Sequence, residues 1–439
     1  MVPLPLRRRP RRPPDHRGPG RARVPQRPLA RRGRGLGAVA HGRGRRPRGA
    51  GGGPSARGRG RRPAPHLAGA DGRGPPPAPR RPGGRGRPPP AGRRAGGAPV
   101  RAAILAVDGG GSKVDAALLS RGGRVLGAAR VAGLRWEQTG DDLHIDSIEA
   151  AARAAARDAG LDPEARPLAE LGVYCVAGAD LPADDRRILR GLRRRRLAER
   201  DVVRNDTFAV LRAGTDRDWG VGIVCGFGTN CSARSPSGRV YRLPAIGGIS
   251  GDWGGGMQLG ETALWHALRA RDGRGPATSL ARSVPAHFGL RTPRQVMEAL
   301  YFRRLEPERL AELAPVVFRD AELGDAVARQ IVDRQAEEIV TMASAAIRRL
   351  RMADLDVDVV LGGGIFRNRF APFFEAIERG IHEVAPRARI IVLAAPPVVG
   401  AAMLGLDGIG ASRAARARVR RELTHERLAG GARAAAGGR

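Results

Sequence analysis

A glycine-rich turn near residue 108 carries groups that could bind a phosphate. The apolar run 104–107 predicts a buried strand, and it ends at Asp108 ahead of three glycines. Because glycine has no Cβ, backbone N–H groups there can close on an anion, and an acid at a strand tip can hold Mg²⁺ through its waters. The loop residues are Gly110, Gly111, Ser112 and Lys113. Taken alone, this pattern fits a phosphate loop and a tight glycine hairpin without a ligand equally well.

The same arrangement returns later in the chain. The apolar run 219–225 leads into a second glycine turn, and the apolar run 357–361 leads into a third. The residues of these turns are Gly226, Gly228, Thr229 and Asn230, and then Gly362, Gly363 and Gly364. Asp108 and Gly226 are 118 residues apart. The most economical interpretation is a duplicated domain whose first two loops face each other across a cleft.

Two further acids are candidates both for chemistry and for helix capping. Asp206 follows a predicted strand and precedes the apolar residues of a predicted helix, which favours an N-cap on the local sequence alone. Asp252 has two interpretations as well, an N-cap or a contact to a bound molecule. It lies in the glycine-rich segment 247–256, ahead of a helical stretch from residue 257. This segment predicts backbone approach to a ligand at an exposed helix N-terminus.

Strands and helices of an α/β protein must position these loops. The periodicity predicts strands at 104–107, 125–130, 171–177, 201–204, 219–225, 231–234, near 240, at 357–361 and at 389–393. It predicts helices at 143–159, 182–198, 257–270 and 321–351, and a last helix opening at 396. Hairpin strands followed by βαβ units predict two domains, 101–214 and 215–412, with a helical insertion in the second.

Composition divides the chain into three regions. Residues 1–100 contain 27 arginines, two acids and no aromatic residue, and residues 413–439 contain eight arginines and two glutamates. Of the net charge of +35, only +4 remains for residues 101–412, which is ordinary for an enzyme. The arm 1–100 cannot bury enough apolar surface to offset its chain entropy, so we expect it to be disordered. Residues 413–439 are expected to form a basic tail.

The arginine-rich arm has two interpretations. Such a segment could bind nucleic acid. Alternatively, the single lysine beside 77 arginines indicates a GC-rich gene, in which a start codon assigned too far upstream would produce the same text. In both cases we expect a variant that starts near residue 100 to match the full chain in melting temperature and turnover. A loss of either on truncation would mean that the arm docks on the core.

The cysteines and the lack of targeting signals narrow the class of protein. Cys175, Cys225 and Cys231 lie in or beside apolar runs and lack the spacing of a zinc site, which predicts buried, reduced thiols. No segment has the core of a signal peptide or the roughly 18 apolar residues of a membrane span. We therefore expect a cytoplasmic protein without a membrane partner.

Taken in order, the motifs resemble the BadF/BadG/BcrA/BcrD ATPase family, which includes N-acetylglucosamine kinases and lies within the hexokinase–actin–Hsp70 superfamily. The resemblance covers about 104–410 and rests on segments 108–113, 205–206, 226–231, 251–256, 362–364 and 396–402. It implies two ribonuclease-H-like domains around a nucleotide cleft, with ATP and Mg²⁺ as cofactors. It also implies a kinase that phosphorylates a hydroxyl of an amino sugar or hexose, with N-acetylglucosamine as the leading substrate.

The resemblance also implies roles for individual residues. Asp108 resembles the acid that holds Mg²⁺ through water, and Asp206 resembles the catalytic base of phosphoryl transfer. The first two glycine loops resemble the phosphate loops, and 362–364 resembles the adenosine loop. Asp252 and Trp136 are the candidate sugar contacts, although a core position is the favoured alternative for Trp136. The sequence departs from the family pattern at Phe227, where a small residue is usual, and at Trp253, where the kinases commonly carry Glu.

Two other functions stay open at this point. Some members of the family activate 2-hydroxyacyl-CoA dehydratases and hold an iron–sulfur cluster between two subunits with two cysteines from each, but none of the cysteines here matches that pattern. A non-catalytic regulator that binds ATP and sugar is the other alternative. The expected partner is a small-molecule sugar, and nucleic acid is expected as a partner only if the basic arm is translated. A homodimer is compatible with the sequence.

Overall fold

The computed structural model describes residues 101–133 and 141–436, and its two mixed sheets repeat one topology. The first sheet has the order β3-β2-β1-β4-β5 and the second has the order β10-β9-β6-β7-β8. The first contains β1 (Ala102–Gly109), β2 (Lys113–Leu119), β3 (Val125–Ala132), β4 (Ala169–Val176) and β5 (Ala198–Asn205). The second contains β6 (Gly220–Cys225), β7 (Thr229–Arg234), β8 (Val240–Arg242), β9 (Asp358–Gly362) and β10 (Arg389–Val392).

Strand directions repeat as well as strand order. In each sheet three consecutive strands form antiparallel hairpins, and the two later strands run parallel to the first of them. This agreement supports the duplication expected from the repeated glycine turns. It also places the glycine turns after β1, β6 and β9 at the carboxyl ends of parallel strands, where ligands bind in open α/β sheets.

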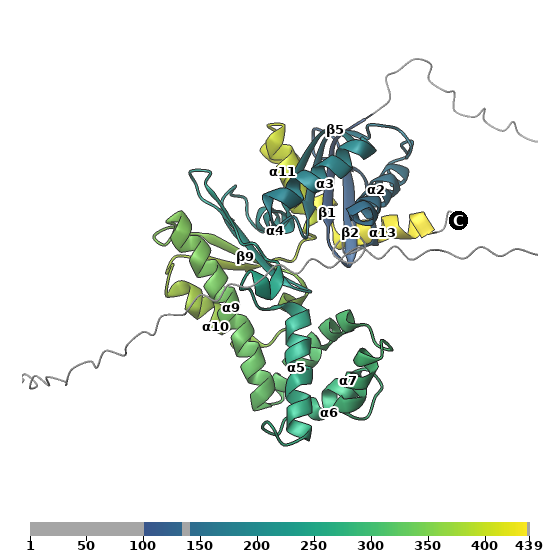
Figure 1. The fold of residues 1–439 in the computed structure, drawn as a ribbon. Helices are drawn as coiled ribbons and strands as arrows, with labels where there is room; N and C mark the ends of the chain where they lie inside the picture. The colour runs from purple at the N-terminus through teal and green to yellow at the C-terminus, as the bar shows by residue number, and fades with distance from the viewer. Residues whose placement is uncertain (1–100, 134–140, 437–439) are drawn as a thin grey trace, which may run out of the picture. The chain divides into compact units, whose positions relative to one another are not determined.

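Helices pack on both sheets and fill a long insertion between β8 and β9 (Figure 1). Those within the first repeat are α2 (Asp141–Asp158), α3 (Pro182–Arg195) and α4 (Asp206–Gly214). The insertion holds η1 (Gly247–Ile249), α5 (Gly255–Arg271), α6 (Leu280–His287), α7 (Pro293–Tyr301), η2 (Pro307–Leu313), α8 (Ala314–Glu322) and α9 (Ala326–Leu350). The remaining helices are η3 (Gly364–Arg367), α10 (Ala371–His382), α11 (Val398–Gly408), α12 (Arg413–Glu422) and α13 (His425–Ala436). None of the described helices combines the length and the apolar composition needed to span a membrane.

The long helix expected over 321–351 is two helices. Gly324 has a φ of +93°, a conformation that glycine adopts without strain, and it separates α8 from α9. The side chain of Asp325 then caps α9 by accepting a hydrogen bond of 2.8 Å from the backbone N–H of Ala328. Apolar spacing continues through this break, which is why the periodicity alone did not reveal it.

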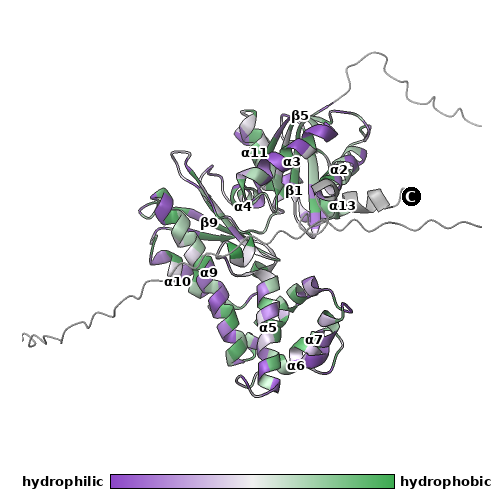
Figure 2. Cartoon of the chain, in the orientation of Figure 1, coloured by the Kyte–Doolittle hydropathy of each residue, from purple (hydrophilic) through white to green (hydrophobic). Residues whose placement is uncertain are grey.

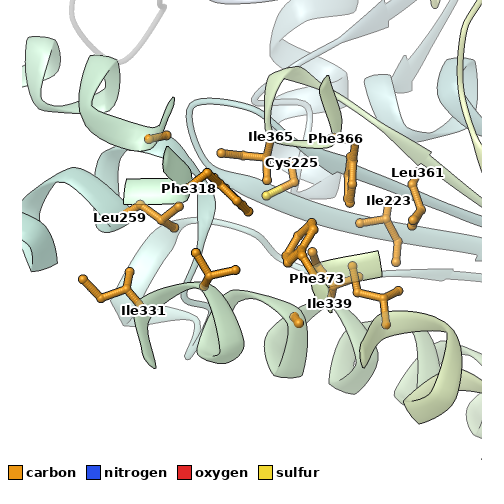
Figure 3. Packing of buried hydrophobic residues seen from close by; sticks show 14 of the residues in the cluster. Ile223, Cys225, Leu259, Phe318, Ile331, Ile339, Leu361, Ile365, Phe366 and Phe373 are labelled. Atoms are coloured by element: carbon orange, nitrogen blue, oxygen red, sulfur yellow. The ribbon is translucent and has the colours of Figure 1, made fainter. Parts of the chain in front are cut away.

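The core of the second repeat lies between its sheet and the helices α5, α8, α9 and α10. Figure 3 shows Ile223 and Leu361 of the sheet packed against Ile339 and Phe373 of these helices. Phe318 and Phe373 meet edge to face with ring centroids 5.1 Å apart. The colouring in Figure 2 shows apolar and polar residues alternating along α9, which is the pattern of a helix with one face on a core.

The three cysteines are buried and free, which confirms the prediction of reduced thiols. Burial raises the pKa of Cys225 and of Cys231 to about 12, and it raises the pKa of Cys175 as well. Neutral, buried thiols are inert. None of them is presented at a surface, so they do not fit the cluster-binding pattern of a dehydratase activator.

The basic segment after residue 412 is helical and packs on the first sheet. Val419, Leu423 and Leu428 are buried there, and the carboxylate of Glu422 accepts a hydrogen bond of 2.9 Å from the N–H of Val125 at the start of β3. Figure 1 shows the yellow helices α11 and α13 beside the blue strands of this sheet. The many arginines of this segment concealed its apolar positions in the sequence. The boundaries of the two proposed domains stay a prediction.

Removing residues 413–439 is therefore expected to destabilise the protein. Each of the three buried apolar side chains contributes about 1.5–3 kcal/mol to the free energy of unfolding. The truncated variant should melt at a lower temperature than the full chain by differential scanning calorimetry. Arg421→Ala, a change on the exposed side of α12, is the control and should leave the melting temperature unchanged. An unchanged melting temperature for the truncated variant would mean that this packing adds nothing to stability.

Candidate active site

The two predicted catalytic acids lie at the carboxyl ends of neighbouring parallel strands. In the register of the first sheet, Gly109 of β1 lies beside Val176 of β4, and Val176 lies beside Asn205 of β5. Asp108 precedes Gly109, and Asp206 follows Asn205 as the first residue of α4. Adjacent strands are about 4.8 Å apart. The fold therefore brings to one edge two acids that are 98 positions apart in the chain.

Burial raises the pKa of both acids. It is the largest cause of the pKa of about 7 for Asp108 and of about 8 for Asp206. Repulsion from the carboxylates of Asp108 and Asp180 raises the pKa of Asp206 further, while the ammonium of Lys113 lowers that of Asp108. Asp206 still keeps part of its surface open to solvent. A carboxyl group whose pKa lies near neutral pH is suited to exchange a proton.

The capping interpretation of Asp206 is wrong, because Asn205 caps α4. The side-chain oxygen of Asn205 accepts a hydrogen bond of 3.1 Å from the N–H of Thr207. The position that satisfies the helix end is therefore one residue before the acid. This leaves the carboxylate of Asp206 at the sheet edge with Asp108.

The first glycine loop is a tight connection between β1 and β2. The N–H of Gly110 donates to the carbonyl of Lys113 at 2.9 Å, and Ser112 is exposed at the tip. Gly133 packs directly against this loop, since a Cβ there would lie 2.3 Å from the carbonyl oxygen of Gly110. The ammonium of Lys113 is held 2.9 Å from the carboxylate of Asp115. The loop thus has an exposed tip and a cation of fixed position.

The second and third glycine loops lie side by side, because β6 and β9 are neighbours. Val224 pairs with Gly362, and the N–H of Gly226 donates to the carbonyl of Gly228 at 2.9 Å. Gly363 has a φ of +111°, and a Cβ there would lie 2.3 Å from the carbonyl oxygen of Cys225. Only glycine fits at this position. Gly228 and Gly364 are exposed and have open space around them, so their backbone can approach a ligand.

The polar side chains of the second loop are used inside the protein. The hydroxyl of Thr229 is directed at sulfur atoms in the core, including Met342 at 3.9 Å. The amide of Asn230 donates to the carboxylate of Asp180 at 2.8 Å. Phe227 is 39 % exposed. The loop therefore presents its backbone rather than the side chains of Thr229 and Asn230.

The N-terminus of α5 is not free for a ligand, which corrects the interpretation of the glycine-rich segment 247–256. The N–H groups of Gly256 and Met257 donate to the carbonyls of Gly226 and Phe227 at 2.8 and 3.0 Å. The N–H of Gly255 donates to the side chain of Gln335. These glycines allow the helix to pack on the second loop, because a Cβ on Gly255 would lie 2.5 Å from Gly228. Sequence alone could not distinguish close packing on protein from close approach to a ligand.

The structure describes one of the two candidate sugar contacts, Asp252, and not the other. The carboxylate of Asp252 accepts hydrogen bonds from the N–H of Gly247 at 3.1 Å and from the hydroxyl of Ser250, so it closes a turn instead of capping α5. Trp253 packs under the guanidinium of Arg334, which lies 4.1 Å from the ring centroid. Trp136 lies outside the described residues, as does the arm 1–100.

A separate cavity of about 930 Å³ lies beside α4. Phe208, Trp219 and Val240 contribute apolar surface to it, and Arg204 is among its basic residues. Among the predicted site residues that the structure describes, none lines this cavity.

Comparison with known proteins identifies the family. The chain matches the BadF/BadG/BcrA/BcrD ATPase family over residues 105–405, more than half of its length. This chain belongs to the BadF/BadG/BcrA/BcrD ATPase family. The match contains the strand ends and all three glycine loops described above.

Two curated relatives of this BadF/BadG/BcrA/BcrD ATPase are named as kinases. It is 29% identical to an N-acetyl-D-glucosamine kinase of Dictyostelium discoideum over 212 residues, which cover 47% of the chain and 65% of the relative, just under two thirds. It is 26% identical to an N-acetylmuramic acid/N-acetylglucosamine kinase of Clostridium acetobutylicum over 247 residues, 56% of the chain and 80% of the relative. A solved Chromobacterium violaceum structure, assigned as an N-acetylglucosamine kinase, shares the fold at a TM-score of 0.55 and 24% identity, covering 69% of this chain and 98% of that one.

Two buried acids of this BadF/BadG/BcrA/BcrD ATPase, Asp115 and Asp180, were missed by sequence reasoning. Asp115 is fully buried on β2, where it pairs with Lys113 and with the guanidinium of Arg130 at 2.6 and 2.8 Å. Asp180 contacts both the end of β5 and the second loop. Asp115 follows the first motif by two residues in a strand that was not predicted. A buried acid in an apolar strand is the signal that could have revealed it.

The raised pKa values predict that this ATPase-family protein loses stability as the pH rises. The pKa of Asp206 is 3.8 in its ordinary state and about 8 when folded, so the folded protein binds more protons than the unfolded chain between these values. Stability falls with rising pH wherever the folded state binds more protons than the unfolded state. Relative to Asp206→Asn, the wild type should therefore become progressively less stable from about pH 4 to 8, by about a few kcal/mol, and change no further above pH 8.

Thermal unfolding of both proteins across this pH range, without nucleotide or Mg²⁺, measures the effect. Asp216→Asn serves as the control, because that side chain is 91% exposed. A difference between wild type and Asp206→Asn that does not change with pH would contradict the raised pKa.

Proposed function

We propose that this protein is an ATP-dependent kinase that transfers the γ-phosphate to a hydroxyl of an amino sugar or hexose, with N-acetylglucosamine as the leading substrate. The observation that carries the proposal is the placement of Asp206, a half-buried residue whose carboxyl has a raised pKa, at the same sheet edge as Asp108. The names of the two curated relatives support the choice of substrate class.

Each group at the site has a defined part in such a reaction. Asp206 accepts the proton of the attacking sugar hydroxyl, which makes the oxygen a better nucleophile. The backbone of the exposed glycines, including Gly228 and Gly364, approaches the nucleotide closely because no Cβ intervenes. Phosphoryl transfer depends mostly on such positioning and on neutralisation of charge. The ammonium of Lys113 adds a positive charge at the first loop.

Mg²⁺ fits the acidic end of this site. Repulsion from the carboxylates of Asp108 and Asp180 raises the pKa of Asp206, and a divalent cation would relieve that repulsion. The described residues contain no group of three or more His, Cys, Asp or Glu side chains that could hold a metal directly. Asp108 would therefore bind the ion through water, and phosphate oxygens would supply further ligands. When bound, Mg²⁺ would neutralise charge on the transferred phosphate.

The test is a panel of sugars offered to the purified full-length protein with Mg-ATP. ADP release is followed by a coupled assay, and the phosphorylated product is identified by ³¹P NMR. We expect release to depend on sugar, with the highest kcat/KM for N-acetylglucosamine among hexoses and amino sugars. Nucleotide binding without sugar-dependent ADP release for any sugar would reject the kinase and favour a regulator that binds ATP and sugar.

A further inference from the structure

One carboxylate connects the acidic edge of the first sheet with the second glycine loop. Asp180 lies between β4 and α3 and is 8% exposed. Its Oδ1 accepts a hydrogen bond of 2.8 Å from the side-chain amide of Asn205 and another of 2.8 Å from that of Asn230. Asn205 ends β5 of the first sheet, and Asn230 belongs to β7 of the second. A single oxygen atom thus holds groups from both sheets.

The side-chain oxygen of each of these two asparagines fixes the backbone next to a functional group. Oδ1 of Asn205 accepts from the N–H of Thr207 at 3.1 Å and from its hydroxyl at 2.6 Å, so it sets the first turn of α4, where Asp206 lies. Oδ1 of Asn230 accepts from the N–H of Cys231 at 2.7 Å, directly after the glycine loop. Because both amides are bonded at both ends, neither can rotate without breaking a hydrogen bond.

We propose that Asp180 is a positioning residue that sets the proton-accepting Asp206 against the nucleotide-binding second loop. This inference rests on the proposed kinase function. Hydrogen bonds to an ionised carboxylate are stronger and shorter than neutral ones, and a shared acceptor couples its two donors. In a reaction that depends on alignment, a displacement of about 1 Å costs about 10²-fold in rate.

A neighbouring contact supplies a matched control. Arg242 of β8 donates to the carboxylate of Asp185 in α3 at 2.7 Å and also to the carbonyl of Ala179. This pair joins the same two parts of the chain as Asp180 does. The carboxylate of Asp185 has no hydrogen bond with Asn205 or Asn230 among the described contacts. Asp185→Ala therefore removes a bridging ion pair and leaves the two amides bonded to Asp180.

The experiment compares Asp180→Ala, Asp180→Asn and Asp185→Ala in the full-length protein. We expect Asp180→Ala to lower kcat by about 10²-fold with a much smaller change in the KM for sugar, since alignment rather than sugar binding is lost. Asp180→Asn keeps an oxygen acceptor for both amides and should retain at least about a tenth of the activity. Asp185→Ala should stay close to wild type. Equal losses in the Ala and Asn variants of Asp180, or an equal loss in Asp185→Ala, would overturn the proposal.

A second measurement does not depend on catalysis. The melting temperatures of Asp180→Ala, Asn230→Ala and the double variant form a cycle, and residues that share a hydrogen bond give non-additive effects. We expect the double variant to melt no lower than the less stable single variant. Additive shifts would overturn the connection even if the wild type is an active kinase. Conversely, a wild type that phosphorylates no sugar rejects the proposed function, while this cycle still decides whether Asp180 and Asn230 are connected.

Discussion

Asp206→Asn is expected to lower the turnover of sugar phosphorylation by about 10²- to 10⁴-fold, which is the usual contribution of a positioned general base. The amide has the shape of the carboxylate but cannot accept the proton of the sugar hydroxyl. Asn205 caps α4 independently of residue 206, so the fold should not change. Steady-state rates at saturating ATP and sugar measure the loss, and calorimetric titration measures the affinity for ATP, which should remain nearly intact.

Two controls make this result specific. Asp216→Asn replaces an exposed acid shortly after the same helix and should leave turnover unchanged. The Asp206→Asn variant should also melt no lower than wild type, because it removes a carboxylate that burial and neighbouring charges disfavour. Near-normal turnover of the variant would remove Asp206 from the role of base.

Asp108→Asn is expected to weaken the use of Mg-ATP by about 10²-fold or more in kcat/KM, since charge stabilisation by a bound metal is worth several kcal/mol. Asp108 is 8% exposed, and burial raises its pKa to about 7, so a bound cation would favour its ionised form near neutral pH. The variant should need more Mg²⁺ for half-maximal rate. A titration of rate against Mg²⁺ at fixed ATP measures the shift.

Stability separates this effect from misfolding. Removing the charge of Asp108 relieves a buried carboxylate, so the variant should melt at or above the temperature of wild type. If Asp108→Asn shows a wild-type dependence on Mg²⁺, the metal-holding role belongs to another group. Asp180 would then be the next candidate, because its charge also acts on Asp206.

Asp206→Asn and Asp108→Asn are expected to affect different steps of the reaction. Loss of the base should affect the chemical step alone, whereas loss of the metal-holding acid should affect the use of the nucleotide. A variant pair that behaves identically in both assays would mean that the two carboxylates act as one unit, as closely coupled acids can.

Much of the fold follows from local sequence signals. Apolar runs such as 171–177 and 357–361 coincide with β4 and β9, because a strand buried in a parallel sheet is apolar on both faces. Signals that mix polar and apolar residues were less informative. β2 begins with Lys113 and contains the buried Asp115, so its run was not recognised as a strand. α12 contains five arginines around Val419, and its charge concealed its buried side.

The sequence by itself determined the order of the glycine turns, the acids beside them and hence the family of this protein. Local residue types specify where a strand ends and where the backbone can bend, since these depend on a few neighbouring residues. Only the tertiary structure decided which glycines face open space and which pack on protein, and that Asn205 rather than Asp206 caps α4. It alone brought Asp180 to Asn205 and Asn230 and raised the pKa of Asp206. Burial, charge repulsion and hydrogen bonds between distant segments depend on how the sheets pack, and no pattern of neighbouring residues contains that information.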